Sequence, residues 1–328
     1  MTRTAHALLA AASTILAACG GGSSDGGNIA LPGLADITST NAPTISSAVM
    51  SSMLEGTDLG SFTGLSTGAG SSPLMGKAVF AKVGSLQTDG VQTLLKQRQL
   101  GIFQAPIDPV TENCLDGGTM TLSANLANPS TMSQGDTISF TYVNCAEGTT
   151  IVNGTFGMTV TSFSGDMLSG AFSFRVSVSL SGFTIVDDGV LATADGDITI
   201  TLTATSQPTL DISVTATSLT VSADGQTNTL TDLTISQGID SVAATYTLDA
   251  SGSLTSSVFE GRVDFATTVA LQGMGEGNAF SGELVISGAA NATIRIRVLD
   301  ATMLRLEIDT NGDGTPDEIV DRSWDELT

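Results

Sequence analysis

The chain has 328 residues, of which 33 are acidic and 11 are basic, so its formal net charge is −22 at pH 7. A surface of this sign repels nucleic acid and anionic lipid headgroups and attracts cations, which excludes nucleic acid as a partner. The apolar fraction of 41% is normal for a folded protein, and the length suffices for one large β domain or two smaller ones.

The N-terminus carries the features of an export signal. Arg3 precedes a short apolar segment, residues 7–18, which is too short to span a membrane. The sequence Leu16-Ala17-Ala18-Cys19 resembles the lipobox of bacterial lipoproteins. That resemblance implies cleavage of a signal peptide, residues 1–18, a diacylglycerol on Cys19, and acylation (as by palmitate) of the new amino group. The alternative is an ordinary cleaved signal with an incidental cysteine.

Residues 19–40 are expected to form a flexible tether, because glycine and serine dominate the segment 20–27. Residue two of the mature chain would be Gly20 rather than aspartate, which by resemblance to Gram-negative lipoproteins favours the outer membrane. The mature chain would carry 33 acidic against 10 basic residues, a net charge near −23. Membrane affinity would therefore come from the N-terminal lipid rather than from charge. The side of the membrane that the protein faces is left open.

Residues 41–104 are expected to form a small helical and irregular N-terminal region. Pro43 suits a first helical turn, and helical spacing follows it at Ile45, Val49, Met50, Met53 and Leu54. A second helical pattern is at Val91, Leu94 and Leu95, after a connector rich in glycine, serine and threonine at residues 60–73. The region is also rich in basic residues, namely Lys77, Lys82, Lys96 and Arg98. They indicate either a solvated helical face or a docking patch for an anionic partner, and we favour the first.

From residue 105 to residue 328 apolar and polar residues alternate, which is typical of antiparallel strands. A recurrent pattern places glycine before apolar residues at plus two and plus four, and it begins at Gly154, Gly170, Gly196, Gly261 and Gly282. We interpret these glycines as strand starts where the sheet bends. The predicted fold is all-β: a large antiparallel meander rolled into a barrel-like or sandwich-like sheet, beside the small helical region.

Two cysteines remain if Cys19 carries lipid. The segments 119–126 and 137–143 read as strands, and Asn128-Pro129-Ser130 between them is good turn chemistry. A hairpin folded there would place Cys114 opposite Cys145 at the spacing that a disulfide needs. We therefore predict a structural disulfide. A redox-active pair, the alternative, usually has a Cys-x-x-Cys arrangement.

The segment 309–321 contains an acidic loop between two predicted strands, residues 303–308 and 318–322. It resembles the calcium loops of EF-hands, dockerins and thrombospondin type 3 repeats. By that resemblance the calcium ligands would be Asp309, Asn311, Asp313, Asp317 and the backbone carbonyl of Thr315. The loop departs from an EF-hand at position 12, which is Val320 instead of glutamate. The alternative is a hairpin turn without metal.

Three arginines, Arg295, Arg297 and Arg305, are predicted to share a region of two neighbouring strands. Guanidinium groups placed so close could bind a carboxylate or phosphate ligand. In so acidic a chain we favour a cross-strand ladder with Glu283 and Glu307.

The sequence offers few catalytic residues. Its only histidine, His6, lies in the predicted signal peptide, which removes histidine-based nucleophilic and zinc chemistry. We therefore expect a non-enzymatic envelope protein, without catalytic residues, that has a structural, surface-interaction or binding role. The alternatives are a carrier of a hydrophobic ligand inside the rolled sheet and, less favoured, a glycosidase that uses a pair of carboxylates.

Overall fold

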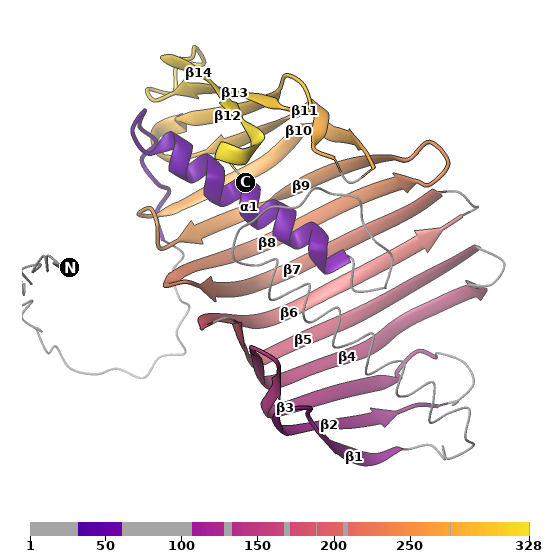
Figure 1. The fold of residues 1–328 in the computed structure, drawn as a ribbon. Helices are drawn as coiled ribbons and strands as arrows, with labels where there is room; N and C mark the ends of the chain where they lie inside the picture. The colour runs from indigo at the N-terminus through magenta and orange to yellow at the C-terminus, as the bar shows by residue number, and fades with distance from the viewer. Residues whose placement is uncertain are drawn as a thin grey trace, which may run out of the picture. The chain divides into compact units, whose positions relative to one another are not determined.

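The computed structural model describes residues 32–60, 107–127, 133–166, 171–187, 189–205, 209–275 and 277–327. These residues form an α-helix, fourteen strands and two short 3₁₀ turns (Figure 1). In chain order the elements are α1 (Ala42–Gly60), β1 (Ile107–Asn113), β2 (Gly117–Asn125), β3 (Thr137–Glu147), β4 (Thr150–Asp166), β5 (Ala171–Asp187), β6 (Val190–Ala204), β7 (Thr209–Ala223), β8 (Gln226–Asp240), β9 (Thr245–Ser256), β10 (Arg262–Met274), β11 (Ala279–Ser287), η2 (Ala289–Asn291), β12 (Thr293–Val298), β13 (Met303–Asp309), β14 (Glu318–Ser323) and η3 (Trp324–Glu326).

Each strand pairs with its neighbours in sequence, so the order along the sheet is β1 to β14. All pairings between the fourteen strands are antiparallel, and β1 does not pair with β14, so this sheet is open at two edges rather than closed into a barrel. The predicted all-β meander beside a small helical N-terminal region is confirmed. The turns after odd-numbered strands share one end of the sheet, which we name the proximal end. The turns after even-numbered strands share the distal end.

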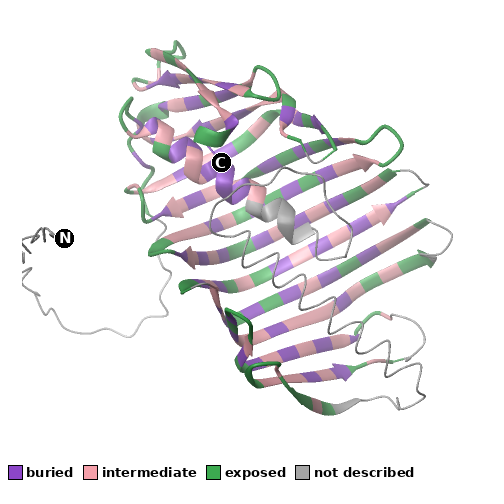
Figure 2. Ribbon diagram, in the orientation of Figure 1, coloured by how far each residue is buried: buried purple, intermediate pink, exposed green. Residues whose placement is uncertain are grey.

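The two faces of the sheet differ in polarity because side chains alternate along each strand (Figure 2). In β5, for example, Phe174, Val176 and Val178 are buried on the apolar face, whereas Arg175 and Ser179 are exposed on the other. Burial of such side chains contributes roughly 1.5–3 kcal/mol each. We call these two surfaces the core face and the outer face.

The alternation is interrupted inside several strands by β-bulges. In β5 the buried positions change from Leu180 to Phe183, where the register with β4 and β6 shifts. Gly154, Gly196 and Gly282 lie inside β4, β6 and β11, so our interpretation of these glycines as strand starts is wrong. Their φ angles are positive, and a Cβ on any of them would collide with the backbone of the neighbouring strand. Glycine is required there by close strand approach rather than by a strand start.

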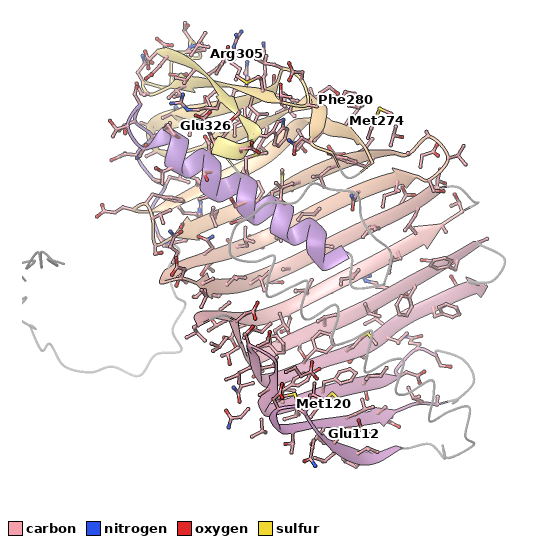
Figure 3. All side chains as sticks on the ribbon, viewed as in Figure 1. Glu112, Met120, Met274, Phe280, Arg305 and Glu326 are labelled. Atoms are coloured by element: carbon pink, nitrogen blue, oxygen red, sulfur yellow. A yellow bond between two sulfur atoms is a disulfide. The ribbon has the colours of Figure 1, made fainter. Side chains whose placement is uncertain are left out.

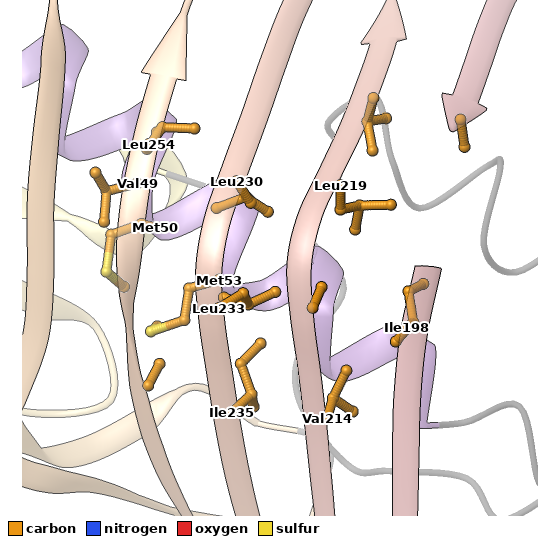
Figure 4. Close-up of a cluster of buried hydrophobic side chains, with 14 of the residues drawn as sticks. Val49, Met50, Met53, Ile198, Val214, Leu219, Leu230, Leu233, Ile235 and Leu254 are labelled. Carbon is orange, nitrogen blue, oxygen red and sulfur yellow. The ribbon is translucent and has the colours of Figure 1, made fainter. Parts of the chain in front are cut away.

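Helix α1, which the apolar spacing predicted, packs on the core face, a placement that the sequence analysis left open. Its contacts are with β7, β8, β9 and β12. The fully buried side chains include Val49, Met50 and Met53, which lie beside Leu230, Leu233, Ile235 and Leu254 (Figure 4). Pro43 lies in the first turn, where its missing N–H is not needed. In the described part of the chain no helix is both long and apolar enough to cross a membrane.

The segment that precedes α1 is attached to the proximal end of the sheet. The amide of Ala35 donates to the carbonyl of Arg262 at 2.7 Å, and the amide of Arg262 donates to the carbonyl of Gly33 at 2.9 Å. Ile37 is buried beside Gly288, where a Cβ would meet its side chain. Residues 33–37, which lie within the predicted tether of residues 19–40, are therefore packed against the sheet, whereas residues 19–31 lie outside the described residues. The second predicted helix, its basic residues and the connector at residues 60–73 lie outside the described residues, apart from the end of α1.

Candidate functional site

The predicted disulfide is present between Cys114 and Cys145, whose Cα atoms are 5.3 Å apart. It joins the β1–β2 turn to β3, and the strands of the predicted hairpin pair in register from Thr119 to Asn125. The predicted turn at residues 128–130 lies outside the described residues. Cys145 is buried in the core, so the bridge fixes the edge hairpin of the sheet to its neighbouring strand.

The acidic loop connects β13 to β14 at the proximal end, as predicted. The carboxylate of Asp309 is buried, with an exposed fraction of 4%, and accepts the amides of Gly312 at 2.7 Å and Gly314 at 2.8 Å. Asp317 accepts the amide and hydroxyl of Thr310 at 2.8 and 2.6 Å. The hydroxyl and amide of Thr310 lower the pKa of Asp317 below its ordinary value of 3.8. The loop is thus held by hydrogen bonds between its own side chains and backbone.

The remaining predicted calcium ligands take part in the same network. Asn311 accepts the amide of Asp313 at 2.9 Å, and Asp313 accepts the amide of Thr315 at 2.8 Å. Within the described residues, no group of three or more His, Cys, Asp or Glu side chains is placed to hold a metal ion. Asp309, Asp313 and Asp317 are therefore close in sequence but not gathered around one point. In this form the loop is a hydrogen-bonded hairpin turn, and calcium binding stays a prediction.

Arg295 and Arg297 form the cross-strand ladder with Glu283 and Glu307 that we favoured from the sequence, whereas Arg305 has a different partner (Figure 3 labels Arg305). Arg297 contacts Glu283 at 3.0 Å and Glu307 at 3.5 Å, and Arg295 contacts the same two carboxylates at 3.6 and 3.8 Å. Arg305 is bonded instead to Asp321 through two hydrogen bonds of 2.8 and 3.0 Å. The guanidinium groups therefore already have carboxylate partners within the chain.

The electrostatics of this ladder favour its ionised form. Partial burial raises the pKa of Glu283, but hydrogen bonds from Thr268 and Arg297 and the charges of Arg295 and Arg297 outweigh that effect. The pKa of Glu283 consequently lies below its ordinary value of 4.5. The hydrogen bond from Arg305 likewise lowers the pKa of Asp321 below 3.8. Both carboxylates therefore favour their charged form in these ion pairs, which link the C-terminal strands β11 to β14.

The outer face carries a surface that the sequence analysis did not single out. A continuous row of serine and threonine residues crosses the outer face from β3 to β9. Each of these seven strands contributes one residue, which pairs in register with a serine or threonine of a neighbouring strand. This hydroxyl row consists of Thr137, Thr159, Ser177, Thr199, Thr215, Thr234 and Ser251. The alternation of apolar and polar residues along each strand predicts hydroxyl groups on the outer face. Their alignment into one row can be seen only when the pairing of the strands is known. The row presents uncharged hydrogen-bonding groups on an otherwise acidic protein.

Several carboxylates of the described residues are engaged by the fold itself. Asp136 is buried and accepts the amides of Ala127 at 2.7 Å and Ser133 at 2.8 Å. Asp264 pairs with Arg262 at 3.2 Å. These acids, like those of the arginine ladder and the β13–β14 loop, have structural partners.

The fold and these features define a disulfide-linked, open antiparallel meander with one helix on its core face. No protein-family model matches the chain, and searches of curated proteins and of solved structures gave no match.

Proposed function

We propose that the chain is a non-enzymatic, lipid-anchored protein of the bacterial cell envelope with a structural, surface-interaction or binding role. The observation that carries this proposal is the lipobox-like sequence Leu16-Ala17-Ala18-Cys19, and the attachment of Gly33 and Ala35 to the proximal end of the sheet adds to it. Only 13 residues, 20–32, then separate the lipobox cysteine, Cys19, from the packed domain. A segment of that length spans at most about 45 Å, so a lipid on Cys19 would hold the domain close to a bilayer.

Two features support a role in interaction rather than catalysis. The hydroxyl row offers a long, uncharged surface, and the charged clusters described above are satisfied within the chain. The only histidine of the sequence is His6, which belongs to the predicted signal peptide. Gly20, the second residue of the mature chain, supports the outer membrane as the destination. We include calcium at the β13–β14 loop in the proposal, because its oxygen-rich side chains suit a hard cation.

Mass spectrometry of the mature protein, purified from the envelope of a Gram-negative host, tests the anchor. We expect an N-terminus at Cys19 that carries a diacylglycerol and an amide-linked acyl chain, and recovery of the protein with membranes. Cys19→Ser should abolish both. A variant with Cys114→Ser and Cys145→Ser is the matched control and should keep the lipid, since those cysteines pair with each other. A mature chain that begins elsewhere, or a membrane fraction unchanged by Cys19→Ser, would contradict the proposal.

A second function, a carrier of a hydrophobic ligand on the core face, is favoured by Gln237. This side chain is 3% exposed and pairs in register with Ile212 and Leu248, both buried. Its amide nitrogen donates to no group in the described part of the chain. An unsatisfied buried donor costs about 1–3 kcal/mol, and a ligand that combines alkyl chains with a carbonyl oxygen would satisfy it.

Native mass spectrometry distinguishes the carrier from the first proposal. A carrier should retain extractable lipid after purification of the Cys19→Ser chain, and Gln237→Leu should lose it. A Cys19→Ser chain without extractable lipid, combined with greater stability of Gln237→Leu, would show that Gln237 is an unsatisfied buried polar group without a ligand and would contradict the carrier hypothesis.

A further inference from the structure

The outer face loses its hydroxyl character at the proximal end between β3 and β6. Ala146 of β3 pairs with Ile151 of β4, Ile151 pairs with Val186 of β5, and Val186 pairs with Leu191 of β6. Leu115 in the β1–β2 turn adjoins them, because the amide of the following residue donates to the carbonyl of Ala146 at 2.9 Å. We name these five residues the apolar strip.

The strip lies on the surface rather than in the core. The exposed fractions of Leu115, Leu191 and Ile151 are 86%, 53% and 38%. On the same strands the core face is occupied by the adjacent residues, including Val152 and Ile185, which are buried. Other exposed apolar side chains, such as Val269 and Ile319, lie on separate strands, whereas this apolar row continues across four paired strands, and contiguous rows of this kind mark contact surfaces.

A hollow continues the strip beyond Leu191. It has a volume of about 370 Å³ and is lined by Val190, Leu191, Thr193, Ser222, Asp224 and Thr227. With Ala223, which also lines it, the hollow combines three apolar side chains with three hydroxyls and a carboxylate.

The attachment of the N-terminal segment indicates which partner surface the apolar strip faces. Three features lie at the proximal end of the sheet: the strip, the hollow, and the attachment of residues 33–37 to Arg262. Each is in, or directly beside, a turn that follows an odd-numbered strand. The 13 residues between Cys19 and Gly33 span at most about 45 Å. The proximal end, where the segment enters the sheet, therefore stays within this distance of the anchor. The distal ends of β5 and β6, strands of 15–17 residues that are about 50–55 Å long, lie farther from Gly33 than the segment can span.

We infer that the apolar strip and its hollow rest on the surface of the bilayer that holds the anchor, and that they select zwitterionic phospholipid. This inference depends on the proposed function for its geometry. The strip supplies apolar contact with the membrane interface. Four carboxylates lie in or directly beside the proximal turns β1–β2, β3–β4, β5–β6 and β7–β8, and these turns contain no lysine or arginine: Asp116, Glu147, Asp187 and Asp224. Carboxylates in this position attract the ammonium of a zwitterionic headgroup and repel a surface with net negative charge.

Vesicle sedimentation of the Cys19→Ser chain tests the contact without the acyl chains. We expect binding to phosphatidylethanolamine–phosphatidylcholine vesicles, and clearly weaker binding to vesicles rich in phosphatidylglycerol. Leu115→Ser together with Leu191→Ser should weaken the first interaction at least about tenfold, because two exposed leucines no longer leave water. Val242→Ser is the matched control, since Val242 is 82% exposed in the distal β8–β9 turn, and it should bind as the Cys19→Ser chain does.

Three outcomes would overturn the inference. The first is equal binding by the leucine variant, and the second is an equal loss in Val242→Ser. The third is a concentration-dependent dimer, measured by light scattering, that the leucine variant abolishes, because the strip would then join two copies of the chain. Failure of the proposed lipid anchor can be told apart from failure of this inference. An absent anchor is seen as an unmodified Cys19 in wild-type protein, whereas vesicle binding by the strip is measured on the Cys19→Ser chain, which carries no lipid. Thermal unfolding of each variant confirms that the exposed substitutions leave the fold intact.

Discussion

Glu283 and Arg297 are paired in register on β11 and β12, and Nε of Arg297 donates to the carboxylate of Glu283 at 3.0 Å. Because this carboxylate has a lowered pKa in the folded chain, it contributes stability that is present above its unfolded pKa, near 4.5, and is lost as pH falls through the lower folded value. We expect Glu283→Gln to lower Tm by roughly 1–3 °C at pH 7. Its Tm should also fall less steeply than that of wild type as pH decreases from about 5 to 3.

Calorimetry across this pH range measures the effect. Glu112→Gln is the control, because Glu112 lies on the exposed edge strand β1 (Figure 3). Its Tm profile should follow that of wild type, and an identical slope for Glu283→Gln would show that the ion pair makes no net contribution.

The glycines inside strands are expected to be intolerant of substitution. At Gly282, φ is +134° and a Cβ would lie 2.7 Å from Cα of Leu271. Gly282→Ala should therefore destabilise the fold by at least about 3 kcal/mol. Gly225 also has a positive φ, +75°, but its Cβ would meet nothing within 4 Å, so Gly225→Ala should cost only about 1–2 kcal/mol. Urea unfolding compares them, and equal losses would contradict the proposed collision between β10 and β11.

Opening the disulfide should destabilise the sheet substantially. The bridged cysteines are 31 residues apart in sequence, which corresponds to a contribution of about 3–4 kcal/mol in the chain-entropy model. A variant with Cys114→Ala and Cys145→Ala should unfold at correspondingly lower denaturant concentration. Addition of reductant should destabilise wild type and leave this variant unchanged. A wild-type curve that is insensitive to complete reduction would contradict the prediction.

Asp309 is expected to stabilise the β13–β14 hairpin even in the presence of a chelator. Asp309→Ala removes the acceptor for the amides of Gly312 and Gly314, which should cost about 2–4 kcal/mol in EDTA. Asp313→Ala is the comparison, because Asp313 accepts only the amide of Thr315 among the hydrogen bonds of the loop. Equal stability of wild type and Asp309→Ala in EDTA would refute this role.

Calorimetric titration separates that structural role from the predicted metal site. If calcium binds, it should raise the Tm of wild type, and Asp313→Ala should reduce the gain. Absence of binding heat together with an unchanged Tm after chelation would end the calcium hypothesis.

The fold class was predictable because alternation and turn chemistry are local signals. The strands flanking Cys114 and Cys145, and those flanking the acidic loop, follow from short windows of sequence, and so does the first half of α1. The arginine ladder was also predictable, because Arg295 and Arg297 share one face of a short strand and the 33 acidic residues of the chain outnumber its 11 basic residues.

Features that depend on strand register were not predictable. The bulge between Leu180 and Phe183 reverses which residues are buried. Gly154, Gly196 and Gly282 were misread because the reason for glycine there is a neighbouring backbone, whereas Gly261 does directly precede a strand, β10. The attachment of Ala35 to Arg262 joins residues more than 200 positions apart, which no local pattern reveals. The apolar strip likewise exists only after four strands have been aligned.

The meander order of the sheet has a consequence for how the chain acquires its structure. Each strand needs only the strand just before it in sequence, so pairing can spread hairpin by hairpin with short loop closures at every step. Helix α1 is the exception, since it is made first but packs on β7–β9, whose residues follow it by about 150 or more positions. Its apolar side must wait for that half of the sheet. Docking of the helix is therefore expected to be a late event in folding, and the step at which the nascent chain is most exposed to aggregation.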